Sequence, residues 1–348
     1  MSRAKKDTPK ALLEGVKKGN VRAIARMISL AEAAKPGSRE VLAEIYRAAG
    51  RAHVIGLTGV PGSGKSMLVN ALAQAIRETG RTVGIVAIDP SSPFSGGAIL
   101  GDRIRMTELT GDDGVFIRSM ATRGAMGGLA RASLEAVDVL DAAGFEVILI
   151  ETVGVGQDEV DIVQAAHTVV VVSAPGLGDE IQTIKAGILE IADIHVVSKC
   201  DRKDANATVS DIRGMLTLGL RPREHGRHHG AEELEEQAAP GEDEWLIGVV
   251  ATSAETGEGI GDLLRAIDAH ARHLNGTGAM DKRRRDIVEM RVIKTAEDII
   301  RRDFRGKRDK LAGLMDDVVA RKMDPRQAAE KLLAAFDNAE GNNGSGKD

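Results

Sequence analysis

The segment GVPGSGKS, from Gly59 to Ser66, constrains the fold of this chain more than any other part of the sequence. It follows a short apolar run and precedes MLVNALAQAIRETG, whose apolar residues recur at helical spacing. A glycine-rich loop between a strand and a helix can turn several backbone N–H groups towards one anion, and the positive end of the helix dipole favours the same anion. The spacing GxxxxGKS in this context predicts a phosphate-binding loop.

Two side chains of this loop carry specific chemistry. Lys65 is expected to reach the β and γ phosphates of a nucleotide, and the hydroxyl of Ser66 is placed to bind Mg²⁺. A chance match in a glycine-rich chain is the competing explanation, but the position directly after the apolar run 53–58 argues against it. We therefore expect a Mg²⁺-dependent nucleotide site.

Acidic residues follow two of the later apolar runs. Asp89 comes directly after the run 82–88, Asp102 lies in the loop beyond it, and Glu151 ends the run 146–151. The carboxyl ends of parallel strands meet at one edge of a sheet, and Mg²⁺ prefers oxygen ligands. Singly, each acid is as consistent with a solvated carboxylate, but three at one edge predict the metal site.

The segment after Glu151 fits the same site. In the common arrangement an acid is followed three residues later by a glycine, whose N–H contacts the γ-phosphate. Gly154 holds that position, with a glutamate in place of the more frequent aspartate. Gln157 lies three residues further on and is not equated with the glutamine that positions water in signalling GTPases. No residue is assigned to the catalytic water.

The alternation of apolar runs and helical stretches predicts the fold class. The runs lie at 53–58, 82–88, 146–151, 167–173, 194–199 and 246–251. Runs such as VILIE and TVVVVS are apolar at successive positions, as expected when helices cover both faces of a parallel sheet. We predict an α/β P-loop NTPase fold with a mostly parallel central sheet flanked by helices.

Segments outside this alternation predict the domain organisation. Residues 1–50 show helical spacing and form an N-terminal helical extension, and residues 51–275 form the nucleotide-binding domain. Within that domain, 219–245 is charged, poor in apolar residues and expected to be a mobile insertion. Residues 276–340 are expected to form a C-terminal helical module, with a disordered tail at 341–348.

Composition excludes several classes of function. The chain has a net charge of -5 and only five Phe, one Trp and one Tyr, so it lacks the basic surface and the stacking rings of nucleic-acid binding proteins. No run of about 18 apolar residues is present, so no membrane span is expected. Cys200 is the single cysteine and excludes an internal disulfide, which fits a cytoplasmic protein.

The base of the nucleotide is expected to lie beside SKCD, Ser198–Asp201, at the end of another apolar run. The carboxylate of Asp201 can accept hydrogen bonds from guanine N1–H and the exocyclic amine, whereas adenine offers an acceptor at the first position. Lys199 would lie against the base through its aliphatic stem. Ser198 stands where asparagine is usual and is not expected to span from the base to the phosphate loop.

A second segment completes this base site. ATSAETGEG begins at Ala251, directly after the last apolar run, and its backbone around Ser253 and Ala254 is expected to meet guanine O6. The pattern KxD also occurs at ordinary strand ends, so the two segments together, rather than either alone, favour guanine.

The chain resembles the MeaB/ArgK-type GTPases associated with methylmalonyl-CoA mutase, over about residues 50–275. The resemblance rests on long motifs besides the phosphate loop. These are IDPSSPFSGGAILGDRIRM from Ile88, RGAMGGLA from Arg123, ETVGVGQDE from Glu151 and PGLGDEIQTIKAGILEIAD from Pro175. It implies a homodimeric GTPase that binds GTP, GDP and Mg²⁺, with a C-terminal helical dimerisation arm. It also implies a partner, an adenosylcobalamin-dependent acyl-CoA mutase, whose cofactor loading is gated and whose active form is protected.

The resemblance also implies roles for individual residues. Nucleotide contacts fall on Gly59, Val60, Pro61, Gly62, Ser63, Gly64, Lys65, Ser66, Met67, Gly154, Lys199, Asp201, Thr252, Ser253 and Ala254. Metal coordination falls on Ser66, Asp89, Asp102 and Glu151, and catalysis on Lys65, Asp102, Glu151 and Lys185. The segment from Gly176 to Lys185 is implied to respond to the nucleotide and to signal to the mutase.

Two other functions remain open. A small-molecule kinase, for example for an amino acid, would use the same phosphate loop but transfer the phosphoryl group to an acceptor. A nickel or zinc carrier is suggested by His225, His228 and His229, although three histidines in a polar loop are usually solvated. The mutase is equally open, since methylmalonyl-CoA, isobutyryl-CoA, 2-hydroxyisobutyryl-CoA and ethylmalonyl-CoA all remain possible substrates of the partner.

Overall fold

The computed structural model describes residues 8–33, 38–89, 109, 111–121, 131–152, 161–176, 190–217, 245–306 and 308–341. The chain divides into two compact units, Met1–Glu289 and Met290–Asp348. The first unit contains the phosphate loop and the seven-stranded sheet, and the described part of the second consists of helices and the turns between them.

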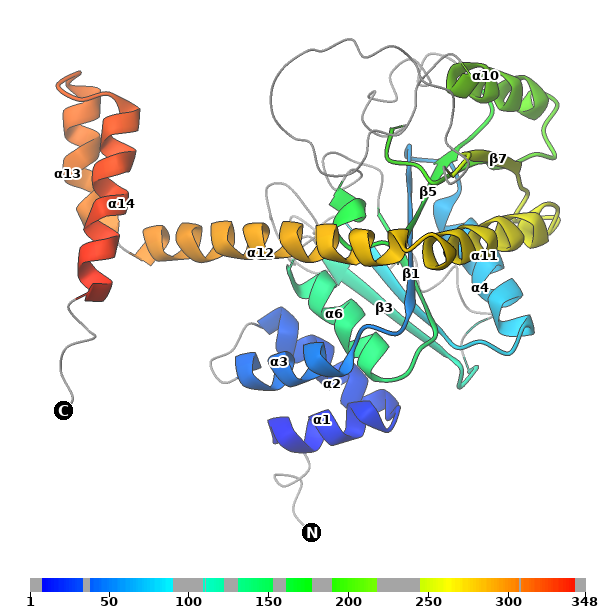
Figure 1. Cartoon of the computed structure of the whole chain (residues 1–348), viewed down its shortest axis with the longest axis horizontal. Helices are drawn as coiled ribbons and strands as arrows, with labels where there is room; N and C mark the ends of the chain where they lie inside the picture. Colours follow the sequence, from blue (N-terminus) through cyan, green and yellow to red (C-terminus); the bar gives the residue numbers. More distant parts are fainter. Residues whose placement is uncertain are drawn as a thin grey trace. The chain divides into compact units, whose positions relative to one another are not determined.

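A seven-stranded sheet forms the centre of the first unit (Figure 1). Its strands are β1 (His53–Gly59), β2 (Val83–Asp89), β3 (Val115–Ala121), β4 (Val147–Glu151), β5 (Thr168–Ser173), β6 (Ile194–Val197) and β7 (Gly248–Ala251). They lie in the order β3-β2-β4-β1-β5-β6-β7, and every neighbouring pair is parallel. The predicted parallel α/β fold is confirmed. The carboxyl ends of β1, β4, β5 and β6 meet at one edge, where ligands bind in open α/β sheets.

One strand was not predicted from the sequence. β3 reads VFIRSMA and pairs only with β2, at the edge of the sheet. Arg118 and Ser119 interrupt its apolar run, and the Arg118 guanidinium is accommodated there because it donates to Ser29 and Glu32 of the N-terminal helices. The turn residues GDDG before it, from Gly111, are the signal that a strand follows.

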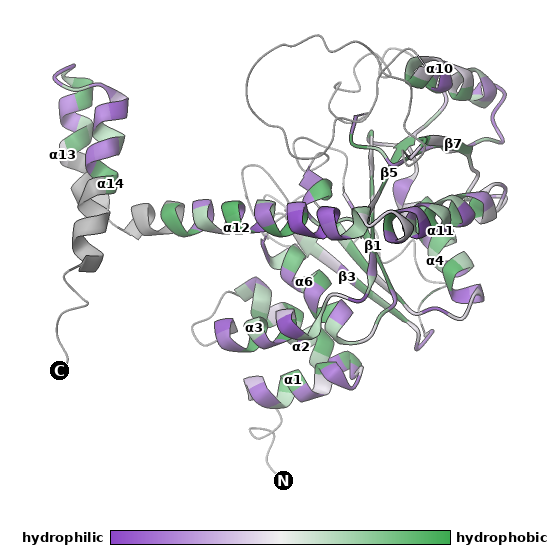
Figure 2. Ribbon diagram, in the orientation of Figure 1, coloured by the Kyte–Doolittle hydropathy of each residue, from purple (hydrophilic) through white to green (hydrophobic). Residues whose placement is uncertain are grey.

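Helices cover both faces of the sheet. They are α4 (Lys65–Glu78), α6 (Arg131–Ala142), α10 (Ala205–Thr217), α11 (Ile260–Gly276) and the 3-10 helix η3 (Ile162–Gln164). Successive strand residues point to opposite faces. Val54 and Val169 pack in the apolar cluster that contains α6 and η3, whereas Ile55 and Val170 pack in the cluster that contains α4 and α11. This two-sided burial explains the unbroken apolar runs, and Figure 2 colours most of the sheet as hydrophobic.

Three helices precede the sheet: α1 (Pro9–Lys17), α2 (Val21–Ala33) and α3 (Ser38–Ala48). Val16, Ile24 and Ile45 are fully buried, and the three helices share an apolar cluster with α6. Asp141 of α6 accepts hydrogen bonds from the backbone N–H groups of Gly50 at 2.8 Å and Arg51 at 3.1 Å. These contacts fix the segment between α3 and β1 to α6, so the N-terminal extension is packed on the first unit.

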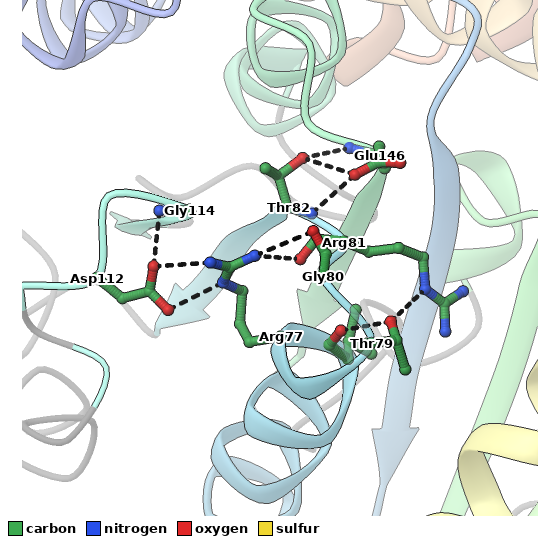
Figure 3. A network of polar contacts seen from close by, with 9 residues as sticks. Arg77, Thr79, Gly80, Arg81, Thr82, Asp112, Gly114 and Glu146 are labelled. Carbon is green, nitrogen blue, oxygen red and sulfur yellow. Dashed lines mark hydrogen bonds and ion pairs between the residues drawn. The ribbon is translucent and has the colours of Figure 1, made fainter.

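The far end of α4 is held by a polar network (Figure 3). Arg77 donates from Nε and Nη2 to the two carboxylate oxygens of Asp112, at 2.9 and 3.0 Å, and from Nη1 to the Arg81 carbonyl at 2.6 Å. The Gly114 N–H donates to Asp112 at 2.7 Å, and a Cβ at Gly114 would lie 2.3 Å from Arg77 Cζ. This network joins the end of α4 to the starts of β2 and β3, so the helix that begins at the phosphate loop is fixed at its other end.

A chain of buried polar contacts lies at the amino-terminal edge of the sheet. His53 Nε2 lies 2.8 Å from Thr168 Oγ1, which lies 2.9 Å from His270 Nδ1. His270 Nε2 lies 3.5 Å from Asp193, and Arg283 holds both oxygens of Asp193 at 3.1 and 2.5 Å. Arg283 belongs to α12 (Ala279–Gly306), so this chain fixes the first turns of α12 to β1, β5 and β6.

Burial controls the pKa values in this region. It lowers the pKa of His53 to about 4 and those of His167 and His270 to about 3. Burial also raises the pKa of Asp193 to about 6, against the opposing charge of Arg283. His167 Nδ1 accepts a hydrogen bond from the Val54 N–H at 3.1 Å, a contact that a protonated ring cannot make.

These shifts predict how stability depends on pH. Between about pH 4 and the ordinary histidine value of 6.5, the unfolded chain binds more protons at His53, His167 and His270 than the folded chain. The free energy of unfolding should therefore rise with pH across this window. Asp193 opposes the rise because its folded pKa is the higher one. With three groups against one, we expect a net rise in urea denaturation experiments, and a smaller rise for His167→Asn. A flat profile would contradict these assignments.

The second unit starts inside α12, at Met290, and contains α13 (Arg308–Val319) and α14 (Pro325–Gly341). α13 and α14 pack against each other. The predicted division at 275/276 falls earlier than this one, because Arg283 and the buried Ile287 keep the start of α12 with the first unit. Large apolar side chains stay exposed on these helices: Val288, Val292, Ile293, Ile299, Ile300, Met315, Val319 and Leu333.

None of the described helices combines the length and the apolar composition that a bilayer crossing requires. The predicted insertion at 219–245 lies outside the described residues except for Trp245, whose indole N–H donates to the Asp193 carbonyl at 2.8 Å. Of the predicted tail at 341–348, only Gly341 is described, as the last residue of α14.

Candidate functional site

The loop between β1 and α4 has the backbone geometry of an anion cradle. Gly59, Gly62 and Gly64 all have positive φ angles, of 137°, 75° and 87°. At Gly59 a side chain is also excluded sterically, because a Cβ would lie 2.1 Å from the Val172 carbonyl oxygen. Only glycine combines this φ with so close an approach to β5. The turn therefore depends on glycine at its first position.

The start of α4 is left without a side-chain cap. Gly64 is the N-cap residue and has no side chain to accept from the first N–H groups of the helix. Ser, Thr, Asp and Asn ordinarily satisfy these donors. With glycine there, the N-cap residue places no side-chain oxygen at the helix start, where the helix dipole favours an anion.

Lys65 is buried within the loop that it serves. Its side-chain ammonium donates to the carbonyl oxygens of Gly59 at 2.7 Å and Val60 at 3.0 Å. A cation held beside the uncapped helix start concentrates positive charge at one point of the sheet edge. Pro61, within the loop, and Met67, in the first turn of α4, are both exposed.

The structure brings two of the predicted metal ligands together. Ser66 Oγ donates to Glu151 Oε1 at 2.5 Å, although the residues are far apart in sequence. β4 lies beside β1 with Leu57 opposite Glu151, and this register places the carboxylate next to the start of α4. Glu151 is 6% exposed. A hydroxyl and a carboxylate at this position form an oxygen donor pair that suits Mg²⁺.

Of the other two predicted acidic ligands, the structure describes the backbone of Asp89 and does not describe Asp102. Asp89 is the last residue of β2, at the same edge of the sheet as Glu151, and its backbone pairs with Ala121. Asp102, Gly154 and Lys185 lie outside the described residues, as do Gln157 and the histidines 225, 228 and 229. Among the described residues no group of three or more His, Cys, Asp or Glu side chains is arranged to hold a metal ion.

Ser198 contacts the phosphate loop through its hydroxyl, and the expectation that a serine cannot also span to the base stays a prediction. Its hydroxyl lies 2.6 Å from the Ser63 carbonyl oxygen and 3.0 Å from the Ser173 carbonyl oxygen. β5 and β6 end beside the loop, and the gap is short enough for a serine.

Lys199 makes a second link to the phosphate loop. Its ammonium donates to the Gly62 carbonyl at 2.9 Å, and its Cε would lie 3.8 Å from a Cβ at Gly64. Its φ of 54° is in the left-handed region, which costs a non-glycine residue on the order of 1 kcal/mol or more. Such strain is concentrated at functional sites, where neighbouring contacts hold it in place.

Asp201 follows directly, with an exposed carboxylate that makes no hydrogen bond or ion pair with the described residues. The base motif is joined to the segment after β7, because the Cys200 N–H donates to the Thr252 carbonyl at 3.0 Å. Burial, followed by the charge of Glu258, raises the pKa of the Cys200 thiol and keeps it protonated.

The segment after β7 is folded into a tight turn. Thr252 is fully buried, and the Ser253 N–H donates to the Glu258 carbonyl at 2.9 Å. Of the two backbone donors predicted to meet guanine O6, the one at Ser253 is thus already used. The Ala254 N–H has no acceptor among the described residues and is the better candidate.

Two contributors to the site were missed from the sequence. The Ser173 carbonyl, at the end of β5, accepts from the Ser198 N–H at 2.9 Å and lies 3.0 Å from the Ser198 hydroxyl. Glu258 supplies the carbonyl that closes the turn at Ser253. Both act through backbone carbonyls, which no residue pattern reveals. Their positions after a predicted strand and within ATSAETGEG were the only available signals.

The chain is similar to known proteins over most of its length. The family model described as methylmalonyl Co-A mutase-associated GTPase MeaB matches residues 24–309. A putative GTPase of Pyrococcus abyssi is 44% identical over 324 residues, which are 92% of this chain and 95% of that protein. GTPase ArgK of Escherichia coli is 31% identical over 296 residues, 83% of this chain and 84% of that protein.

Two further comparisons extend this result. The mitochondrial methylmalonic aciduria type A homolog of Mus musculus is 31% identical over 285 residues, 81% of this chain and 65% of that protein. A crystal structure described as LAO/AO transport system kinase superposes with a TM-score of 0.67 at 22% identity, covering 97% of this chain and 99% of that one. At this identity the likeness shows the shared fold alone.

Proposed function

The chain belongs to the MeaB family of methylmalonyl-CoA mutase-associated GTPases, and on this premise we propose that its GTPase cycle serves an adenosylcobalamin-dependent acyl-CoA mutase. The nucleotide state would gate cofactor delivery to the mutase and protect or reactivate it. The observation that carries the nucleotide site is the 2.5 Å contact between Ser66 and Glu151 beside the uncapped start of α4.

The described residues divide the chemistry among themselves. The N–H groups of residues 62–67 and the Lys65 ammonium would bind the phosphates, and Lys65 would stabilise the charge that develops on the γ-phosphoryl oxygens. Ser66 and Glu151 fit Mg²⁺, with Asp89 and Asp102 as further candidate ligands. When bound, the ion would neutralise charge on the β and γ oxygens. Asp201 would hold the guanine ring through its N1–H and exocyclic amine.

Hydrolysis rather than transfer to an acceptor is the expected outcome of this site. A kinase also needs a group that accepts the proton of the acceptor, close to the γ-phosphate. Among the described residues the buried acid next to the phosphate loop is Glu151, and it is engaged with Ser66. Thin-layer separation of the products of labelled GTP decides between the two. Free phosphate supports the GTPase, and a labelled amino acid would support a kinase.

The C-terminal helices support the proposal of a homodimer. Val292, Ile293, Ile299 and Ile300 are 44–62% exposed on α12, and burying such side chains is favourable at about 25 cal/mol per Å². A second copy of the chain is the proposed cover for this surface. The proposed location is the cytoplasm, where a single cysteine stays reduced.

The effect of the mutase on GTP turnover tests the proposed partner. Intrinsic hydrolysis should be slow because Lys65 is the single cation among the described residues that the proposed mechanism assigns to the γ-phosphate. A cation or an ordered loop supplied by the mutase should raise the rate about 10-fold or more. Purified methylmalonyl-CoA, isobutyryl-CoA, 2-hydroxyisobutyryl-CoA and ethylmalonyl-CoA mutases would each be added, with serum albumin as the control. If the rate of GTP hydrolysis is unchanged with all four mutases, the proposal of a mutase partner is wrong.

A further inference from the structure

We propose that Ser198, in the base motif, gives no hydrogen bond to guanine N7, because its hydroxyl and its N–H are both committed to backbone carbonyl oxygens of the phosphate loop and β5. This rests on the proposed placement of guanine beside Asp201. Ser198 is 5% exposed and lies between the end of β6 and the phosphate loop.

The difference between a hydroxyl and an amide is one of proton count. An asparagine amide has two N–H protons and a carbonyl oxygen, so it can serve a base and a backbone group at once. A serine hydroxyl has one proton. Guanine N7 is an acceptor and can be read only by a donor. Serine at this position must therefore choose between the base and the protein.

The contacts of Ser198 show where its proton goes. The nearest acceptor is the Ser63 carbonyl at 2.6 Å, within the phosphate loop, and the next is the Ser173 carbonyl at 3.0 Å. The backbone N–H of Ser198 is also used, since it donates to the Ser173 carbonyl at 2.9 Å. Both donors of this residue end on backbone oxygens, and neither is left for a base.

The neighbouring donor is directed elsewhere as well. The Lys199 ammonium lies 2.9 Å from the Gly62 carbonyl, over the phosphate loop. The polar side-chain groups of Ser198 and Lys199 thus both contact carbonyl oxygens of the phosphate loop and are not directed to a base. Ser198 is by this account a positioning residue for the phosphate loop, and base selectivity falls on Asp201 and the segment after β7.

The test is a comparison of GDP with 7-deaza-GDP, in which a C–H group replaces N7. Each would displace a fluorescent guanine nucleotide from the full-length chain in the presence of Mg²⁺. Wild type should bind the two with affinities within about twofold of each other. Ser198→Asn restores a second donor and should create a preference for GDP of about 2- to 10-fold, the worth of one hydrogen bond. A wild-type preference above about fivefold, or no gain in Ser198→Asn, would overturn the proposal.

Two more variants separate positioning from reading. Ser198→Ala should weaken GDP and 7-deaza-GDP by the same factor, and Ser198→Thr, which keeps the hydroxyl, should restore both. Weakening of GDP alone in Ser198→Ala would show that the hydroxyl reads N7 after all. Asp201→Asn tests the pocket itself. If Asp201→Asn leaves the affinity for GDP unchanged, the base lies elsewhere and the proposed site fails. If Asp201→Asn weakens GDP binding but the wild-type chain prefers GDP to 7-deaza-GDP, the proposed site stands and only the N7 inference is overturned.

Discussion

Replacing Lys65 with Met should lower GTP turnover about 10³-fold or more while the chain stays folded. The Lys65 ammonium lies inside the phosphate loop, 2.7 Å from the Gly59 carbonyl and 3.0 Å from the Val60 carbonyl. Charge builds on the γ-phosphoryl oxygens during transfer, and a preorganised cation in a buried site stabilises it far more than water does. Met keeps an apolar stem of similar length and removes the charge together with the N–H donors that hold the Gly59 and Val60 carbonyl oxygens.

The measurement for Lys65→Met is single-turnover release of phosphate from GTP. A circular dichroism melt close to that of wild type would show that the fold is kept. Lys203→Met, on the exposed turn after the base motif, is the matched control and should retain wild-type turnover. Turnover of Lys65→Met within tenfold of wild type would mean that another group carries the charge stabilisation.

Replacing Asp201 with Asn should exchange the base preference from guanine to xanthine. The carboxylate accepts from N1–H and the exocyclic amine of guanine, whereas an amide can donate to the second carbonyl oxygen of xanthine. A site that hydrogen-bonds its substrate rejects an analogue that leaves polar groups unpaired by up to about 10⁴-fold. GTP hydrolysis should fall about 10³-fold in kcat/KM and XTP hydrolysis should rise.

Asp201 is exposed and makes no hydrogen bond or ion pair with the described residues, so its replacement should leave stability unchanged. The neighbouring acid Asp204, which lies 3.7 Å from Arg202, is the matched control. Asp204→Asn should leave kcat/KM for GTP within about twofold of wild type. A variant Asp201→Asn that still prefers GTP would place the base outside SKCD.

The fold could be predicted because its signals are local. Six of the seven strands coincide with the predicted, mostly apolar runs, and a run such as TVVVVS is apolar at successive positions because both faces of the sheet are covered. β3 failed the same criterion because an edge strand tolerates Arg118 and Ser119. The missed strand and the confirmed ones thus follow from the same physics.

The site could be predicted only in part. Glycines and charged groups such as Lys65 and Glu151 are visible in a sequence because the chemistry needs those residue types. Contacts that end on backbone carbonyls are not visible, and the link from Ser198 to Ser63 is of this kind. It depends on how closely β6 approaches the phosphate loop, which is decided by packing across the sheet and not by any residue in the motif.

The polar chain at the opposite edge was likewise hidden from the sequence. His53, Thr168 and His270 lie in three different elements and have no common spacing. Their contacts connect the start of α12 to the strands of the phosphate loop and the base site, through Asp193 and Arg283. The first turns of α12, which belong to the first unit, are therefore packed against the sheet that carries the nucleotide site.

A crystal structure of the chain with a non-hydrolysable GTP analogue and Mg²⁺ tests the account of the site most directly. The metal should lie about 2.1 Å from Ser66 Oγ, with Glu151 as a ligand or bonded to a coordinated water. The guanine should lie with N1–H and its amine on Asp201 and with N7 free of any contact from Ser198. A metal that does not touch Ser66, or a base bound away from Asp201, would contradict the account.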